Sequence, residues 1–138
     1  MFRLVNDVAA YPDFLPWCRS AVVHIETHEV MEATLELSSK GLSKAFTTRN
    51  RLTRDRRIEI GLLEGPFSTL EGAWTFEELD EHASEVALGL RFAFRNPVNA
   101  LLFGPMFEDI ATSLVDAFSK RARSVYGERS GGVAGDDR

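Results

Sequence analysis

The sequence predicts an α+β protein in which a curved antiparallel sheet is closed by a long C-terminal helix. Six segments between Cys18 and Phe94 alternate apolar and polar residues with a period of two, as strands do. Short links rich in glycine or charge separate these segments, which favours hairpins. Residues 96–126 then carry apolar side chains at steps of three and four, the spacing of an amphipathic helix.

The length and composition predict one soluble domain. A chain of 138 residues can build a single hydrophobic core, and 44% hydrophobic with 27% charged residues is ordinary for a globular protein. The net charge of −5 argues against a surface that binds nucleic acid everywhere, although a local basic face is compatible with it. We expect a cytoplasmic domain over residues 1–127 and a disordered tail over residues 128–138, which has almost no apolar content.

The chain begins with helical sequence and then changes period. Residues 1–10 predict a short helix, although no N-cap residue is visible. Pro12 and Pro16 restrict the next stretch to a turn or a single helical turn. The predicted strands lie at about 21–26, 31–38, 42–53, 58–62, 70–79 and 85–95, with turns at 27–29, 54–57, 64–67 and 80–82. Consecutive strands of this kind form an antiparallel meander with one dry and one wet face.

The final helix has clear signals at its start and in its interior. Asn96 is a good N-cap residue and Pro97 suits the first helical position. Pro105, after Gly104, cannot donate a hydrogen bond to the carbonyl of Leu101, so we expect a kink there. The apolar stripe of the helix consists of Phe103, Phe107, Ile110, Leu114, Phe118, Ala122 and Val125.

The dry face of the predicted sheet is rich in aromatic residues, which leaves two interpretations open. The aromatic side chains of sheet and helix can fill a solid core, or they can wall a cavity for an apolar ligand. Thr48 and Asn50 lie on the dry face, with Lys44 at the start of the same strand. A buried polar group without a partner is costly, whereas a ligand cavity uses a few such groups to orient its ligand. This observation favours a cavity.

Few residues suggest catalysis. The three histidines, His24, His28 and His82, fall on a polar strand face or in turns, so we expect neither a catalytic nor a metal-binding cluster. No spacing resembles a zinc, P-loop or dinucleotide motif. Cys18, the single cysteine, excludes an internal disulfide, and we interpret it as a structural thiol.

Charge is distributed unevenly along the chain. Residues 44–57 contain six Lys or Arg and one acid, and residues 71–85 contain six acids and no Lys or Arg. In the simpler interpretation these charges pair across strands on the wet face and add little stability. In the functional interpretation a basic hairpin binds RNA or anionic phospholipid. That hairpin would present Arg49, Arg51, Arg54, Arg56 and Arg57.

Several motifs together resemble one family, the coenzyme Q-binding START-like proteins, also known in bacteria as the ribosome association toxin RatA family. The order and spacing of the motifs match from about residue 2 to residue 126. The motifs are LVNDV (4–8), YPDFLPWC (11–18), KAFTTRN (44–50), GPF (65–67) and GAWTF (72–76).

The resemblance implies a helix-grip fold with an apolar cavity between sheet and helix. It also implies non-enzymatic binding of ubiquinone or a related polyprenyl lipid in support of respiration, with no separate cofactor. For some bacterial members it implies association with the large ribosomal subunit and interference with subunit joining. Family members usually have a strand before the first helix, and here that strand is absent from the pattern. We therefore expect an unpaired sheet edge that invites self-association.

The leading hypothesis is a quinone-binding protein, peripheral at the inner membrane. A second is a ribosome-binding inhibitor that acts through the basic hairpin, and a third is an enzyme, since the same fold houses polyketide cyclases. Under the first hypothesis Thr48 or Asn50 meets the ring oxygens of the quinone. The expected ligand-binding residues are Phe46, Thr48, Asn50, Phe67, Trp74, Phe76, Phe92, Leu114 and Phe118.

Overall fold

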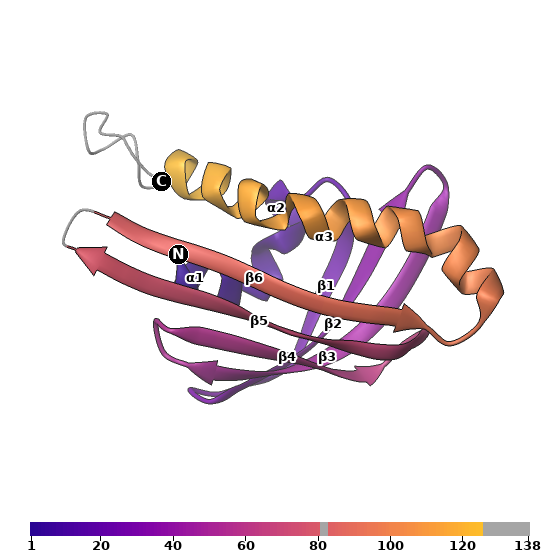
Figure 1. Ribbon diagram of the computed structural model, residues 1–138, viewed down its shortest axis with the longest axis horizontal. Coiled ribbons are helices and arrows are strands. Elements are labelled where there is room, and N and C mark those ends of the chain that lie inside the picture. Colours follow the sequence, from indigo (N-terminus) through magenta and orange to yellow (C-terminus); the bar gives the residue numbers. More distant parts are fainter. Residues whose placement is uncertain (81–82, 126–138) are drawn as a thin grey trace.

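Three short helices precede the sheet in the computed structural model, which describes residues 1–80 and 83–125 (Figure 1). They are α1 (Phe2–Asn6), the 3-10 helix η1 (Val8–Ala10) and α2 (Tyr11–Phe14). The predicted single helix over residues 1–10 is therefore wrong. Asp7 separates α1 from η1 with φ −85° and ψ 70°, and α1 has no side-chain cap. The single helical turn allowed between the two prolines is confirmed as α2.

The predicted six-stranded meander is confirmed. The sheet order is β1-β2-β3-β4-β5-β6, and every neighbouring pair is antiparallel. β1 and β6 form the edges, since each pairs with one neighbour within the described residues. Self-association through such an edge stays a prediction. The strands are β1 (Cys18–Glu26), β2 (Val30–Ser39), β3 (Leu42–Thr53), β4 (Arg57–Glu64), β5 (Phe67–Asp80) and β6 (Ala83–Phe94).

Five of the six strands begin one to three residues earlier than predicted, and β3 begins at residue 42 as predicted. β4 begins at Arg57, which shortens the charged turn to residues 54–56. β5 begins at Phe67 because Phe67 pairs with Phe94 across the β5–β6 ladder. Most of the predicted turn at 80–82 and the predicted tail at 128–138 lie outside the residues that the structure describes.

The last element is one continuous helix, α3 (Pro97–Val125), which lies on the dry side of the sheet along β6 (Figure 1). The predicted cap is confirmed: the Asn99 amide donates a hydrogen bond of 2.8 Å to Oδ1 of Asn96. The helix continues through Pro105, and Figure 1 shows its first turns set at an angle to the rest. None of the described helices is both long and apolar enough to cross a membrane.

The predicted helix stripe packs against the sheet along most of its length. Phe103, Phe107, Ile110 and Phe118 are buried, whereas Val125 at the end of the stripe is 40% exposed. Phe118 is the most enclosed of these, with 1% of its surface exposed. The short helices α1 and α2 cover one end of the space between the sheet and α3. The core is therefore enclosed by the sheet, by α3 and by the N-terminal helices.

Candidate functional site: an apolar cavity and an arginine turn

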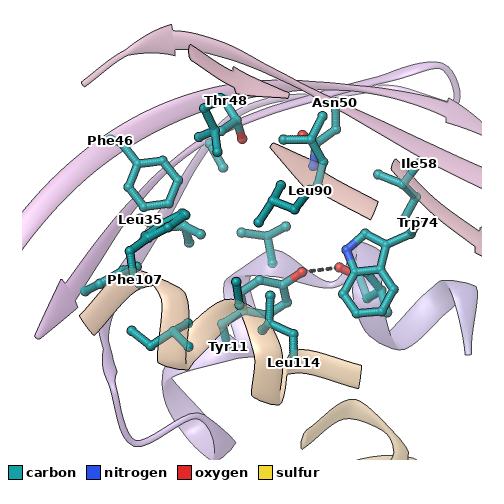
Figure 2. A pocket seen from close by; sticks show the side chains of 18 of the residues that line it. Tyr11, Leu35, Phe46, Thr48, Asn50, Ile58, Trp74, Leu90, Phe107 and Leu114 are labelled. Atoms are coloured by element: carbon teal, nitrogen blue, oxygen red, sulfur yellow. Dashed lines mark hydrogen bonds between the residues drawn. The ribbon is translucent and has the colours of Figure 1, made fainter. Parts of the chain in front are cut away.

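The core contains a cavity between β2–β6, the N-terminal helices and the middle of α3 (Figure 2). The volume of the cavity is about 100 Å³. One water needs about 10–15 Å³ on this measure, so the space accommodates several waters or a small ring. Its lining is mostly aliphatic and aromatic, contributed for example by Leu35, Ile58, Leu90 and Ile110.

Six of the nine predicted ligand-binding residues line this cavity: Phe46, Thr48, Asn50, Trp74, Leu114 and Phe118. They come from β3, β5 and α3, which the fold brings together around one space. Figure 2 shows Thr48 and Asn50 on the sheet wall and Leu114 on the opposite, helical wall. Their role in ligand binding stays a prediction.

The other three predicted residues lie outside the cavity because neighbouring aromatic rings cover them. Phe76 stacks on Trp74 and meets Phe2 of α1, with 5.7 Å between the ring centroids of Phe76 and Phe2. The rings of Phe67 and Phe92 both pack against Phe107, at centroid distances of 5.0 and 4.6 Å. Phe67 instead borders a second, much smaller cleft near the start of α3.

The cavity wall formed by β3 carries the polar groups expected there. Thr48 is the one buried polar residue among those described, with 8% exposed. Oδ1 of Asn50 is buried and has no hydrogen-bond partner. A buried carbonyl without a partner costs about 1–3 kcal/mol, and a water or a ligand in the cavity would supply that partner. Lys44, also predicted near the site, instead places Nζ 5.1 Å from the ring centre of Phe103, outside the cavity.

Tyr11 is the main lining residue that the sequence analysis missed. Its hydroxyl donates a short hydrogen bond to the carbonyl oxygen of Val5 (Figure 2). The pKa of Tyr11 is raised, mainly because the side chain is buried. The phenol therefore stays protonated. In the sequence, Tyr11 stands in a group of aromatic residues before the first strand, which hints at burial but not at the cavity. Tyr11 reaches the cavity because α2 folds over the sheet.

Cys18 is a structural thiol by its surroundings. The side chain lies in the core, with 4% of its surface exposed. Burial raises the pKa of the Cys18 thiol to about 11, so the reactive thiolate is scarce at neutral pH.

The predicted basic hairpin divides into paired and free arginines. Arg49 forms an ion pair with Glu32 across the β2–β3 ladder, and Arg57 pairs with Glu59 at 3.1 Å. In the acidic stretch, residues 71–85, Glu71 forms an ion pair with Arg91 of β6. Cross-strand pairing thus accounts for part of the charge pattern, although among the residues that the structure describes no ion pair joins the two charged stretches.

Three arginines at the β3–β4 turn remain available to a partner. Arg51, Arg54 and Arg56 are exposed, and we call them the arginine turn. Arg54 lies 3.9 Å from the carboxylate of Asp55, with both side chains largely in solvent. In the part of the chain that the structure describes, Arg51 and Arg56 form no ion pair.

A six-stranded antiparallel sheet that grips a long C-terminal helix around an apolar cavity is the architecture of the START-like, helix-grip proteins. Residues 1–119 match the family model described as polyketide cyclase/dehydrase and lipid transport. The chain belongs to this family.

Proteins with different names are among the relatives of this chain. The chain is 46% identical to the ribosome association toxin RatA of Vibrio cholerae, over 93% of this chain and 89% of the relative. It is 25% identical to the mitochondrial coenzyme Q-binding protein COQ10 homolog B of Xenopus laevis, over 94% of this chain and 54% of that protein. Among solved structures, the Zhui aromatase/cyclase from a Streptomyces species superposes with a TM-score of 0.72. It shares 22% identity and covers 99% of this chain and 89% of its own, so the likeness concerns the fold.

Proposed function

We propose that this protein binds the ribosome and limits the joining of its subunits. The observation that carries the proposal is the set of relatives named ribosome association toxin, at 42–46% identity over more than nine-tenths of the chain. This proposal corrects the order of the hypotheses drawn from the sequence, in which quinone binding came first. The arginine turn also supports the proposal, because it offers a positively charged surface to RNA.

The arginine turn is suited to a phosphate backbone. Its three cations are exposed, they project from one hairpin, and guanidinium groups bind phosphate in bidentate geometry. The rest of the protein is acidic, with a net charge of −5 overall, so the local positive potential orients the molecule. A polyanion such as ribosomal RNA would approach this end of the sheet and be repelled by most other faces.

Co-sedimentation with purified large ribosomal subunits tests the proposal. The variant Arg51→Glu/Arg54→Glu/Arg56→Glu should stay in the supernatant while the unmodified protein pellets with the subunit. The control Arg19→Glu/Lys120→Glu/Arg123→Glu changes the net charge equally at other exposed positions and should still pellet. Undiminished sedimentation of the arginine-turn variant would refute this surface as the ribosome contact.

A second function, binding of ubiquinone or a similar lipophilic molecule, is favoured by the cavity and by the orphaned Oδ1 of Asn50. A distant relative carries the name coenzyme Q-binding protein. Organic extraction of the purified protein followed by mass spectrometry tests for a bound quinone. Trp17 and Trp74 line the cavity, so added quinone should quench their fluorescence, and the cavity-filling variant Ala111→Phe should abolish the change.

An enzymatic role has less support in the cavity. Tyr11 is the one titratable side chain in its lining, and its proton is already donated to Val5. General acid–base catalysis requires groups that exchange protons near neutral pH, and burial moves the pKa of Tyr11 away from that range. Binding without turnover therefore fits the lining better than a cyclase reaction does.

A further inference from the structure

The second, smaller cleft lies beside the cavity, near the start of α3. Its volume is about 10 Å³, and its lining comes from the sheet, from the β4–β5 turn and from the N-terminal part of α3. Leu37, Phe46 and Phe107 line both the cleft and the cavity. These three residues therefore stand between the two spaces.

Lys44 gives the cleft a positive charge. Among the residues that the structure describes, it is the one charged residue in a lining that is otherwise apolar. Its side chain is half-buried, and Nζ lies 5.1 Å from the centre of the Phe103 ring. No described carboxylate forms an ion pair with Lys44. An ammonium donates up to three hydrogen bonds, so Nζ has capacity left for an anionic group in the cleft.

One strand links the cleft to the cavity. Four residues form a row on the dry side of β3: Lys44, Phe46, Thr48 and Asn50. Lys44 lines the cleft, Phe46 lines both spaces, and the last two line the cavity. A strand rises about 3.3 Å per residue, so this row is about 20 Å long. Its length and apolar surroundings suit an extended hydrocarbon chain.

Aromatic rings close the passage between the two spaces. Phe46 and Phe107 meet edge to face, with 5.9 Å between the ring centroids. Figure 2 shows them on the same side of the cavity, one from the sheet and one from α3. Phe67 packs on both rings, at centroid distances of 5.6 and 5.0 Å. These contacts are apolar, so a hydrocarbon chain that separates the rings would replace them with contacts of the same kind.

We propose that the cleft and the cavity together bind a single-chain amphiphile with an anionic head, the class of the fatty acids. The carboxylate would bind Nζ of Lys44, and the chain would pass between Phe46 and Phe107 into the cavity. A charge-assisted hydrogen bond at one end and apolar contacts along the chain fix this orientation. The proposal rests on the second function above, ligand binding in the cavity, and it is independent of the ribosome contact.

Titration with decanoate tests the site of the anionic head. Trp17 and Trp74 line the cavity, so entry of the chain should change their fluorescence. Lys44→Gln should weaken decanoate binding by about ten-fold or more, because the carboxylate loses its cation, and should leave the binding of uncharged decanol unchanged. The control Lys40→Gln removes an exposed lysine outside the lining and should bind decanoate as the unmodified protein does.

A labelled chain tests the orientation. Decanoate with bromine on its terminal carbon should quench the tryptophan fluorescence more strongly than decanoate, because the bromine would lie in the cavity. Ala111→Phe, which fills the cavity, should abolish the binding of both. The absence of decanoate binding, equal affinity of Lys44→Gln and the unmodified protein, or no additional quenching by bromine would each overturn the proposal. Quinone binding that persists in such a case would leave the second function intact.

Discussion

The indole ring of Trp74 meets the phenyl ring of Phe118 edge-to-face, with 5.4 Å between the ring centroids. Trp74 belongs to β5 and Phe118 to α3, so this contact fastens the helix to the middle of the sheet. The ring of Tyr11 packs on Phe118 as well, at 5.3 Å. Phe118 is thus the point at which sheet, long helix and N-terminal helices meet beside the cavity.

Replacing Phe118 should cost more stability than almost any other change in the helix. Phe118→Ala removes a side chain that is 1% exposed and enlarges the neighbouring cavity, so we expect a loss of about 3–5 kcal/mol in the free energy of unfolding. Urea denaturation followed by fluorescence measures this loss. Val125→Ala, at a position 40% exposed on the same helix, should change stability by less than about 0.5 kcal/mol. Similar losses for both variants would contradict the assigned packing.

Two glycines in the β5–β6 ladder provide a matched pair. A Cβ on Gly72 would lie 2.3 Å from the carbonyl oxygen of Gly89, a backbone atom that cannot move alone. Gly72→Ala should therefore destabilise the fold by about 1–3 kcal/mol or more. A Cβ on Gly89 meets nothing within 4 Å, so Gly89→Ala should be nearly neutral. Thermal unfolding of the two variants checks the difference, and equal melting temperatures would contradict the close approach of the two strands.

Asn50 should strengthen the binding of a polar-headed ligand in the cavity and lower the stability of the folded protein. Because its Oδ1 is buried without a partner, Asn50→Leu should raise the free energy of unfolding by about 1 kcal/mol. The same variant should bind a polar-headed quinone analogue less tightly, as measured by titration of Trp fluorescence. Thr48→Val tests the neighbouring hydroxyl in the same assay. A less stable Asn50→Leu variant with unchanged affinity would show that the amide is structural.

Alkaline pH should destabilise the protein through Cys18. Burial raises the pKa of the thiol from 9.0 to about 11, so the unfolded chain loses its proton first as pH rises. The stabilising contribution is complete below about pH 9 and is lost by about pH 11, on the order of 2–3 kcal/mol. Urea denaturation of Cys18→Ala at both pH values should show a correspondingly smaller drop. Part of the drop will persist in this variant, because burial also raises the pKa of Tyr11.

The strands and the start of α3 follow directly from local patterns. Alternation identified all six strands, and Asn96 with Pro97 marked the first turn of the helix. Local patterns failed where tertiary pairing decides the structure. Phe67 joins β5 because Phe94 lies opposite, a contact between residues far apart in the chain. The break at Asp7 likewise has no proline or glycine to signal it.

For the site, periodicity predicted the face of each side chain but not its position along the sheet. Phe46, Trp74, Phe76 and Phe92 all point to the dry side, yet the cavity opens beside the first two alone. Phe2 covers Phe76, and Phe107 covers Phe92, because of how α1 and α3 cross the sheet. Arg49 was indistinguishable from the free arginines until the register of β2 and β3 placed Glu32 beside it, whereas Arg57 and Glu59 pair within one strand.

The order of the strands has a consequence for how the chain folds. Each strand pairs with the next one in sequence, so the sheet can grow one hairpin at a time as the polypeptide is synthesised, with little loop-closure entropy to overcome. The N-terminal helices cover one end of the aromatic side of that sheet, and the rest stays uncovered until α3, the last described element, has been made. During synthesis this surface is open to chaperones and to aggregation, and the final helix ends that exposure when it docks.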